Sequence, residues 1–446
     1  MRLEGANSLV VGMKKSGMAS VELLVRERAR VRATDLKPLA ELPEAAGLLA
    51  RLGVPFAQQT PAVFEGCDLI VLSPDVPADL PPLNQARRRG VPVIGEVELA
   101  APFLLGQTIG ITGSNGKTTT TSLVGHILRE SGVPVQVGGN IGTPVTAMVA
   151  SSHAGGWNVL ELSSFQLETI EKFRAHIAVA LNVTQNHLDR HHTFENYAAI
   201  KGRLFDTQQE GDIAVLNAED AVCVGYAERT PAVAQWFSGK RKVKPGASLC
   251  GDKLVLDGKL MMEARDVRIR GRHNLENVLA AAVASAHAGV AREAIADAVR
   301  TFRAVEHRLE FVRNVGGVEF YNDSKATSVD ATLKAVDAFD GGLWVILGGK
   351  DKGLDYSLLR TALAAKARAA LLIGAAGPKI ADQLRDAVPL VDSQTLDAAI
   401  AYAYRNALPG DTVLLAPACA SFDQFRSFEH RGEVFKQLVA NLQPKN

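Results

Sequence analysis

A glycine-rich segment that ends in a lysine and two threonines could hold phosphate groups. It runs from Gly110 to Thr119, between an apolar stretch and a helical pattern. Glycines let backbone N–H groups turn toward phosphate oxygens, and the start of a helix adds a positive dipole. Lys117 offers an ammonium and Thr118 a hydroxyl for Mg²⁺, whereas Ile111 replaces a glycine of the strict pattern. The segment predicts ATP or GTP binding without naming the reaction.

Two further polar groups stand where apolar stretches end. Glu161 closes one such stretch, and His187 lies just beyond another. The carboxyl ends of parallel strands meet at the crevice where such sheets bind ligands, and a carboxylate with an imidazole suits a metal near phosphate. In isolation, either residue is more often an ordinary surface group. A crevice shared with the phosphate loop favours the metal interpretation.

The opening segment Gly12–Gly17 follows a short apolar stretch and also precedes a helical pattern. A dinucleotide fingerprint needs glycine at position 14, where Lys14 stands, so hydride chemistry is disfavoured. The turn could still hold a pyrophosphate, with Asp35 accepting hydrogen bonds from a ribose or base. A purely structural turn remains an open alternative.

Composition limits the class of protein. The 446 residues suffice for about three domains, and 47% hydrophobic with 22% charged residues is close to the globular average. A net charge of +1 gives no general attraction to nucleic acid or anionic lipid. The four cysteines form no CxxC pair, which favours a reducing cytosol, and no apolar run reaches the length of a membrane span. We expect no nucleic-acid partner, no membrane partner and a cytoplasmic location.

The phosphate loop and the other groups are positioned by a regular alternation of apolar stretches and helical patterns. It begins at residue 8, continues from residue 108 through the helical stretch 275–288, and restarts near residue 318. This pattern favours α/β units with mainly parallel sheets covered on both faces. We place the boundaries near residues 97 and 301.

Eight segments, in order, make the chain resemble the Mur ligase family. They are Thr112–Thr119, Asn140–Gly142, Glu161–Gln166, His187–Arg190, His273–Asn277, His307–Arg308, Asn322–Thr327 and Ala416–Phe425. The segments starting at Glu161 and Ala416 are most similar to those of the family members that add D-glutamate. No Asp-Asn-Pro-Arg segment, typical of the members that add diaminopimelate or lysine, is present.

The resemblance implies a three-domain α/β fold. A Rossmann-like domain (residues 1–97) would bind the uridine nucleotide, a central P-loop ATPase domain (98–301) would bind ATP, and a C-terminal dinucleotide-fold-like domain (302–446) would bind the amino acid. It also implies an ATP-dependent ligase acting on the small-molecule substrates UDP-N-acetylmuramoyl-L-alanine and D-glutamate. The muramoyl-alanine carboxylate would attack the γ-phosphate, and the amine of D-glutamate would displace phosphate from the acyl phosphate. We expect a monomer.

The resemblance also assigns roles residue by residue. Thr118 and Glu161 would bind one Mg²⁺, and Glu161, His187 and a carbamylated Lys201 a second. Without the resemblance, Lys201 would be an ordinary helix-face lysine. The other implied contacts are, for the nucleotide, Gly113, Ser114, Asn115, Gly116, Lys117, Thr118, Thr119, Asn277, Arg308 and Asp323; for catalysis, Lys117, His187, Lys201 and Lys325; and for the substrates, Lys15, Ser16, Gly17, Asp35, Ser73, Asn140, His187, Thr327, Lys352, Ser421 and Phe428. Phe428 could equally be a core residue.

Several positions depart from the family pattern. Lys14 and Lys15 occupy the usual glycine-rich turn, Leu36 follows Asp35 where a hydroxyl is common, and Asp75 stands where glycine is expected. Asn186 precedes His187 where a carboxylate is frequent, which removes a charge beside the expected metal site.

Two other functions remain open. The first is a related ATP-dependent ligase, such as another Mur ligase or a folylpolyglutamate synthase. The second is a nucleotide-dependent regulatory protein that binds ATP without substrate-stimulated turnover. Glu161, His187 and Lys201 argue against the second, because a simple switch does not need them.

Overall fold

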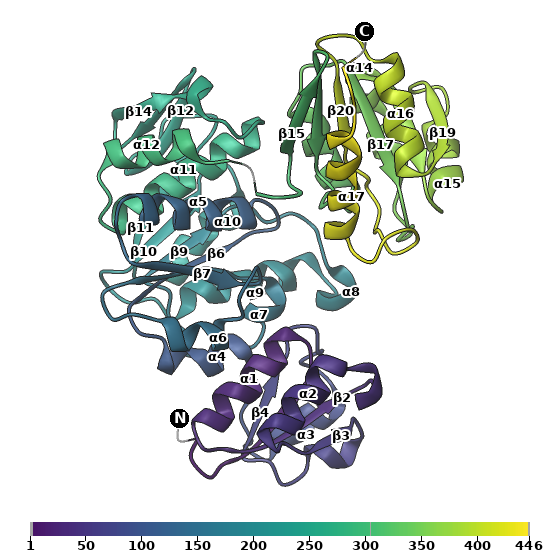
Figure 1. Ribbon diagram of the computed structural model, residues 1–446. Helices are drawn as coiled ribbons and strands as arrows, with labels where there is room; N and C mark the ends of the chain where they lie inside the picture. Colours follow the sequence, from purple (N-terminus) through teal and green to yellow (C-terminus); the bar gives the residue numbers. More distant parts are fainter. Residues whose placement is uncertain (1–2, 304, 445–446) are drawn as a thin grey trace. The chain divides into compact units, whose positions relative to one another are not determined.

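The structure is a computed structural model that describes residues 3–303 and 305–444, with three separate sheets (Figure 1). By internal packing the chain forms two compact units. One unit runs through Ala264 and includes Glu276–Val299, and the other combines Arg265–Leu275 with the chain from Arg300 onward. Each unit has hydrophobic core clusters of its own.

The first sheet is five-stranded, with the order β3-β2-β1-β4-β5 and parallel pairing throughout. Its two faces are both buried, since Val10 of β1 packs in a cluster with Val21 and Leu49, whereas Leu9 packs in another cluster with Leu83. Continuous apolar strands fit a parallel sheet covered on both faces. The elements are β1 (Asn7–Val11), α1 (Lys15–Arg26), β2 (Arg30–Asp35), η1 (Leu39–Glu41), α2 (Pro43–Leu52), β3 (Phe56–Gln58), η2 (Pro61–Phe64), β4 (Leu69–Leu72), α3 (Pro81–Arg88), β5 (Val93–Gly95), α4 (Glu96–Ala100) and η3 (Ala101–Phe103).

The second sheet is nine-stranded, with the order β14-β13-β12-β11-β10-β9-β6-β8-β7. The pairs from β7 to β12 are parallel, and β12, β13 and β14 form an antiparallel extension. The strands are β6 (Gln107–Thr112), β7 (Val135–Gly139), β8 (Trp157–Glu161), β9 (Ile177–Ala180), β10 (Ile213–Asn217), β11 (Val233–Ser238), β12 (Gly246–Cys250), β13 (Lys253–Leu256) and β14 (Lys259–Glu263). The helices are α5 (Lys117–Glu130), α6 (Val145–Met148), η4 (Val149–Ser151), α7 (Ser164–Leu167), α8 (Leu188–His191), α9 (Phe194–Asp206), α10 (Ala221–Gly225), η5 (Tyr226–Arg229), η6 (Ala264–Asp266), α11 (Arg272–His287) and α12 (Arg292–Thr301).

The third sheet is six-stranded, with the order β15-β16-β20-β17-β18-β19. Only the pair at its β15 edge is antiparallel. The elements are β15 (Glu310–Val315), β16 (Val318–Asn322), α13 (Val329–Asp337), β17 (Leu343–Gly348), η7 (Tyr356–Leu359), α14 (Arg360–Lys366), β18 (Ala367–Ile373), α15 (Gly377–Leu384), β19 (Leu390–Gln394), α16 (Leu396–Asn406), β20 (Thr412–Leu415) and α17 (Phe428–Ala440).

The architecture confirms the expected α/β class with mainly parallel sheets. The antiparallel strands β12 to β14 and β15 were not expected. The proposed boundaries at residues 97 and 301 stay predictions. No helix within the described ranges has the length and hydropathy that crossing a membrane requires.

Candidate active site

The glycine-rich segment forms the turn between β6 and α5, as expected. Gly116 has a φ of 84°, in the left-handed region that favours glycine. A Cβ atom on Gly116 would lie 2.3 Å from Oδ1 of Asn277, so the loop packs closely against α11. The Lys117 ammonium donates to the carbonyls of Gly113 (2.8 Å) and Ser114 (3.1 Å). The lysine is therefore already held inside the loop where phosphate oxygens would accept its hydrogen bonds.

The strand-end segment after β9 fixes the same loop. The Ser114 hydroxyl donates to the Thr184 carbonyl at 2.9 Å, and the backbone N–H of Asn115 donates to Asn182 Oδ1 at 2.9 Å. Thr118 and Thr119 follow in the first turn of α5 and are both buried. These contacts give the loop a defined shape, which an anion-binding turn needs if its N–H groups are to converge.

Glu161 lies at the end of β8, which pairs in parallel with β6 so that Glu161 is opposite Ile111. The side-chain amide of Asn140 donates to Glu161 Oε1 at 2.8 Å. The other carboxylate oxygen, Oε2, is buried and has no hydrogen-bond partner among the described residues. A buried carboxylate oxygen without a partner is costly. The structure therefore brings together two predicted residues and leaves one ligand atom available beside the phosphate loop.

His187 and Lys201 come from the segment and helix that follow β9. His187 has a φ of 54°, a strained conformation for a residue other than glycine, and its ring contacts Phe165 with centroids 5.0 Å apart. Lys201 is buried in α9, and its ammonium donates to the Gly113 carbonyl at 2.9 Å. Burial, with the nearby Lys117 charge, lowers the pKa of Lys201 well below its ordinary value. Lys201 is thus a buried amine beside the phosphate loop, not a surface lysine.

The predicted uridine-binding residues surround the ends of β1, β2 and β4. Asp35 accepts from the backbone N–H of Met13 at 2.7 Å, and the Ser73 hydroxyl donates to the Gly12 carbonyl at 2.7 Å. These bonds join the three loops, and Lys15, Ser16 and Gly17 form the first turn of α1.

Two departures from the family pattern turn out to be partners. The Lys14 ammonium lies 2.6 Å from Asp75 Oδ2, and both side chains are exposed. The pair joins the loops that follow β1 and β4, which are neighbours in the first sheet. The two changes therefore compensate each other in charge.

The second unit contains the remaining predicted residues. Lys352 donates to the hydroxyl and carbonyl of Thr327 at 3.4 and 3.3 Å. The Lys325 ammonium lies 5.6 Å from the centre of the Phe428 ring, so Phe428 faces a predicted site residue. Ser421 is buried in the loop that follows β20.

Asp323 and Arg308 carry the predicted nucleotide contacts of this unit. Burial raises the pKa of Asp323 to about 6, and the charge of Arg308 opposes that rise. Arg308 Nε is buried without a hydrogen-bond partner among the described residues. His307 and Leu309, which flank Arg308, have φ values of 62° and 43°. Two strained residues thus flank Arg308 just before β15.

Family models cover most of the chain in three consecutive matches. They are the MurD-like N-terminal domain of Mur ligases over residues 6–95, the Mur ligase middle domain over 111–285, and the Mur ligase glutamate ligase domain over 307–419. A protein of Solibacter usitatus named UDP-N-acetylmuramoylalanine–D-glutamate ligase is 75% identical, with 100% of both chains covered. The chain belongs to the Mur ligase family.

Other relatives of this Mur ligase carry the same name. The ligase of Acidobacterium capsulatum is 51% identical, covering 98% of this chain and 97% of the relative, and that of Koribacter versatilis is 49% identical, covering 99% of both. Among solved structures, the UDP-N-acetylmuramate-alanine ligase of Thermotoga maritima matches with a TM-score of 0.61 at 18% identity, over 98% of this chain and 99% of that one. A pseudomurein peptide ligase type C of Methanothermus fervidus gives 0.60 at 16% identity, over 98% and 99%. These structures support the fold.

Oxygen ligands around the phosphate loop of this Mur ligase fit magnesium. Mg²⁺ prefers carboxylate, hydroxyl and phosphate oxygens. The buried Oε2 of Glu161 supplies such an oxygen, and Thr118, in the first turn of α5, supplies a hydroxyl. The donor set therefore suits the ion that ATP chemistry requires.

Two arginines of the Mur ligase were not predicted from the sequence. Arg190 forms an ion pair with Glu168 at 2.7 Å and donates to the Val76 carbonyl at 2.8 Å, so it ties the segment after His187 to the loop after β4. Arg431 is completely buried in α17. Arg190 stands in the His187–Arg190 segment, which could have indicated it, whereas no local pattern distinguishes Arg431 from an exposed helix arginine.

Proposed function

We propose that this Mur ligase joins D-glutamate to UDP-N-acetylmuramoyl-L-alanine with consumption of ATP, a step in peptidoglycan precursor synthesis. The observation that carries the proposal is the full-length similarity to the Solibacter usitatus ligase of that name. The phosphate loop, the buried Glu161 and the buried Lys201 support an enzyme and not a nucleotide switch.

The proposed reaction activates a carboxylate before an amide bond forms. The terminal carboxylate of the uridine substrate attacks the γ-phosphate of ATP, which gives an acyl phosphate and ADP. The amine of D-glutamate then attacks the acyl carbon and releases phosphate. Lys117, with its ammonium inside the phosphate loop, would reduce the repulsion between the two anions as they meet. Asn140, held against Glu161, would orient the uridine substrate.

Metal binding in this proposal uses Thr118 and Glu161 for one Mg²⁺, and Glu161, His187 and a carbamylated Lys201 for a second. When bound, Mg²⁺ would neutralise phosphate charge. The lowered pKa of Lys201 favours its uncharged amine, and only an uncharged amine reacts with CO₂. Carbamylation would turn this amine into an anion suited to a metal.

In this proposal, each of three domains binds a different substrate. Residues 1–97 would bind the uridine nucleotide through Lys15, Ser16, Gly17, Asp35 and Ser73, and residues 98–301 would bind ATP through the phosphate loop and Asn277. In residues 302–446, Arg308 and Asp323 would contact the nucleotide, and Lys325, Thr327, Lys352, Ser421 and Phe428 would surround D-glutamate.

We further propose a cytoplasmic monomer. The four cysteines are free, and Cys67, Cys223 and Cys419 are buried as thiols, which suits a reducing compartment. Sedimentation of the purified protein would test the monomer.

The deciding experiment measures phosphate release from ATP with Mg²⁺ and UDP-N-acetylmuramoyl-L-alanine. D-glutamate is compared with L-glutamate, L-alanine and diaminopimelate at equal concentration. We expect release that depends on both the uridine substrate and D-glutamate. Phosphate release that requires a different amino acid would be consistent with the Mur ligase family but would contradict D-glutamate as the substrate. ATP binding without phosphate release, with every amino acid tested, would favour a regulatory protein.

A further inference from the structure

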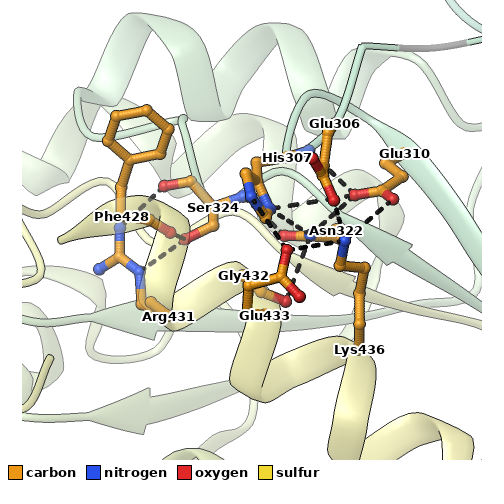
Figure 2. A network of polar contacts seen from close by, with 10 residues as sticks. All are labelled: Glu306, His307, Glu310, Asn322, Ser324, Phe428, Arg431, Gly432, Glu433 and Lys436. Carbon is orange, nitrogen blue, oxygen red and sulfur yellow. Dashed lines mark hydrogen bonds and ion pairs between the residues drawn. The ribbon is translucent and has the colours of Figure 1, made fainter.

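Arg431 of α17 has a fully buried guanidinium with an unusual set of partners. Its side chain is 0% exposed. Nε donates to the Ser324 hydroxyl at 2.9 Å, and one terminal nitrogen donates to the Ser324 carbonyl at 2.8 Å (Figure 2). The terminal nitrogens also donate to the Cys419 carbonyl at 3.2 and 3.3 Å and to the Ala420 carbonyl at 3.5 Å.

These partners include no carboxylate. All are a hydroxyl or backbone carbonyls, and no ion pair of Arg431 occurs among the described residues. Burial lowers the pKa of Arg431 to about 10, which still leaves it charged at neutral pH. The charge of Asp423 opposes that fall, but Asp423 forms no ion pair with Arg431 among the described residues, so burial of the guanidinium remains costly. This cost indicates that the hydrogen bonds of the guanidinium have a role that a buried apolar side chain could not fill.

The guanidinium joins three segments, one of which lies far from the other two in the sequence. They are the loop after β16, the loop after β20 and the first turn of α17. The Ser324 hydroxyl completes the junction because it also donates to the Phe428 carbonyl at 2.8 Å. One side chain therefore fixes the distances between all three segments.

Each segment presents a proposed contact of D-glutamate directly beside its bond to this junction. Lys325 follows Ser324, Ser421 follows Ala420, and Phe428 begins the helix that carries Arg431. Recognition of a dicarboxylate requires cations and hydroxyls at fixed separations. A shift of one segment would thus change the spacing of the groups that bind the amino acid.

We propose that Arg431 is a positioning residue for D-glutamate, which sets the spacing of Lys325, Ser421 and Phe428. The proposal rests on the proposed function, because these side chains meet D-glutamate only in a D-glutamate-adding ligase. Arginine suits the task because its planar fork has five N–H donors and here reaches one hydroxyl and three backbone carbonyls at once. A lysine would keep the charge and lose the fork.

The test compares KM for D-glutamate with KM for ATP in purified full-length variants. For Arg431→Lys we expect KM for D-glutamate to rise about tenfold or more, with KM for ATP within about twofold of the parent value. Ser324→Ala removes the two hydrogen bonds of the Ser324 hydroxyl, with Arg431 Nε and with the Phe428 carbonyl, and leaves every charge in place. It should shift KM for D-glutamate in the same direction by a smaller factor. It also keeps the proposal testable if Arg431→Lys does not fold.

Arg360 provides a matched control in the same unit. Its guanidinium donates to the carbonyls of Gln383 (3.0 Å) and Arg385 (2.8 Å), away from the three segments. Arg360→Lys should change neither KM. Equal rises in both KM values for Arg431→Lys, or an unchanged KM for D-glutamate in both Arg431→Lys and Ser324→Ala, would overturn the positioning role. A different result would come from the parent enzyme if it released phosphate only with another amino acid. That result would contradict the proposed function, and the positioning role for D-glutamate would fall with it.

Discussion

Lys201 looks unremarkable along the sequence, yet its environment makes it chemically distinctive. It lies 1% exposed in α9, with its ammonium 4.7 Å from the centre of the Tyr197 ring. Desolvation is the main reason for its lowered pKa, and Lys117 contributes in the same direction. The lowered pKa favours the uncharged form of the amine, which is the form that carbamylation needs.

Replacing Lys201 tests that chemistry. Lys201→Ala should lower kcat at least about a hundredfold, because it removes a proposed ligand of the second Mg²⁺, the ion that would neutralise phosphate charge. Short carboxylates such as acetate or formate should restore part of the activity by filling the place of the carbamate. Lys253→Ala, an exposed lysine of β13, serves as the control and should keep parental kcat. Full activity of unrescued Lys201→Ala would contradict the role.

Helix α17 shows how one element supports the residues around Arg308. Its Lys436 forms ion pairs with Glu433 at 3.0 Å and Glu310 at 3.6 Å, and also with Glu306 (Figure 2). His307 lies against the same helix, and its Nδ1 accepts from the Asn322 amide at 2.9 Å. The His307 carbonyl accepts from the backbone N–H of Lys325 at 3.1 Å. The helix thereby supports the backbone on both sides of Arg308.

This contact depends on Gly432. A Cβ atom there would lie 2.2 Å from His307 Nδ1 and 3.0 Å from Asn322 Nδ2. Gly432→Ala should lower the free energy of unfolding by about 1–3 kcal/mol through overpacking, although alanine favours helices. Urea denaturation would measure the loss.

A glycine of α2 gives the matched comparison for Gly432. A Cβ atom on Gly47 would have no neighbour within 4 Å, so Gly47→Ala should not cause overpacking. We expect Gly47→Ala to raise the free energy of unfolding by up to about 1 kcal/mol, because alanine is the better helix former. Equal effects of the two substitutions would show that the close approach of α17 to His307 has no energetic consequence.

Across the protein as a whole, α4 joins the first sheet to the second through two buried glutamates. Glu96 accepts from the Thr146 N–H at 2.6 Å and the Thr146 hydroxyl at 2.9 Å. Glu98 accepts from the backbone N–H groups of Glu171, Lys172 and Phe173, at 2.8, 2.9 and 3.0 Å respectively. These carboxylates bind backbone groups that would otherwise lack partners.

Glu96 makes the stability of the protein depend on pH. Burial raises its pKa from 4.5 to about 7, and the bonds from Thr146 oppose the rise. The folded state therefore binds more protons than the unfolded state between these values, and stability falls as pH rises through that window. Relative to Glu96→Gln, the parent should lose about 3 kcal/mol of unfolding free energy between about pH 4.5 and about pH 8. Parallel pH profiles of urea unfolding for the two proteins would contradict this.

The phosphate loop, the parallel α/β class and the family could all be predicted from the order of the residues. Glycine, lysine and threonine at fixed spacing act within a single turn, and apolar periodicity reflects burial of each element separately. Glu161 and His187 could be proposed as strand-end residues for the same reason. Strands β12 to β14 were missed because short antiparallel strands lack the alternation with helices that revealed the others.

Contacts between side chains that are far apart in the sequence, by contrast, depend on packing in three dimensions. Lys14 and Asp75 are 61 residues apart, and Arg431 lies 107 residues from Ser324. The pairing of Asn140 with Glu161 also joins separate elements. A residue type states which bonds a side chain can form, whereas packing decides which partner it meets and whether water remains to compete. Burial is therefore what lowers the pKa of Lys201, and packing is what places Arg431 at the junction of three segments.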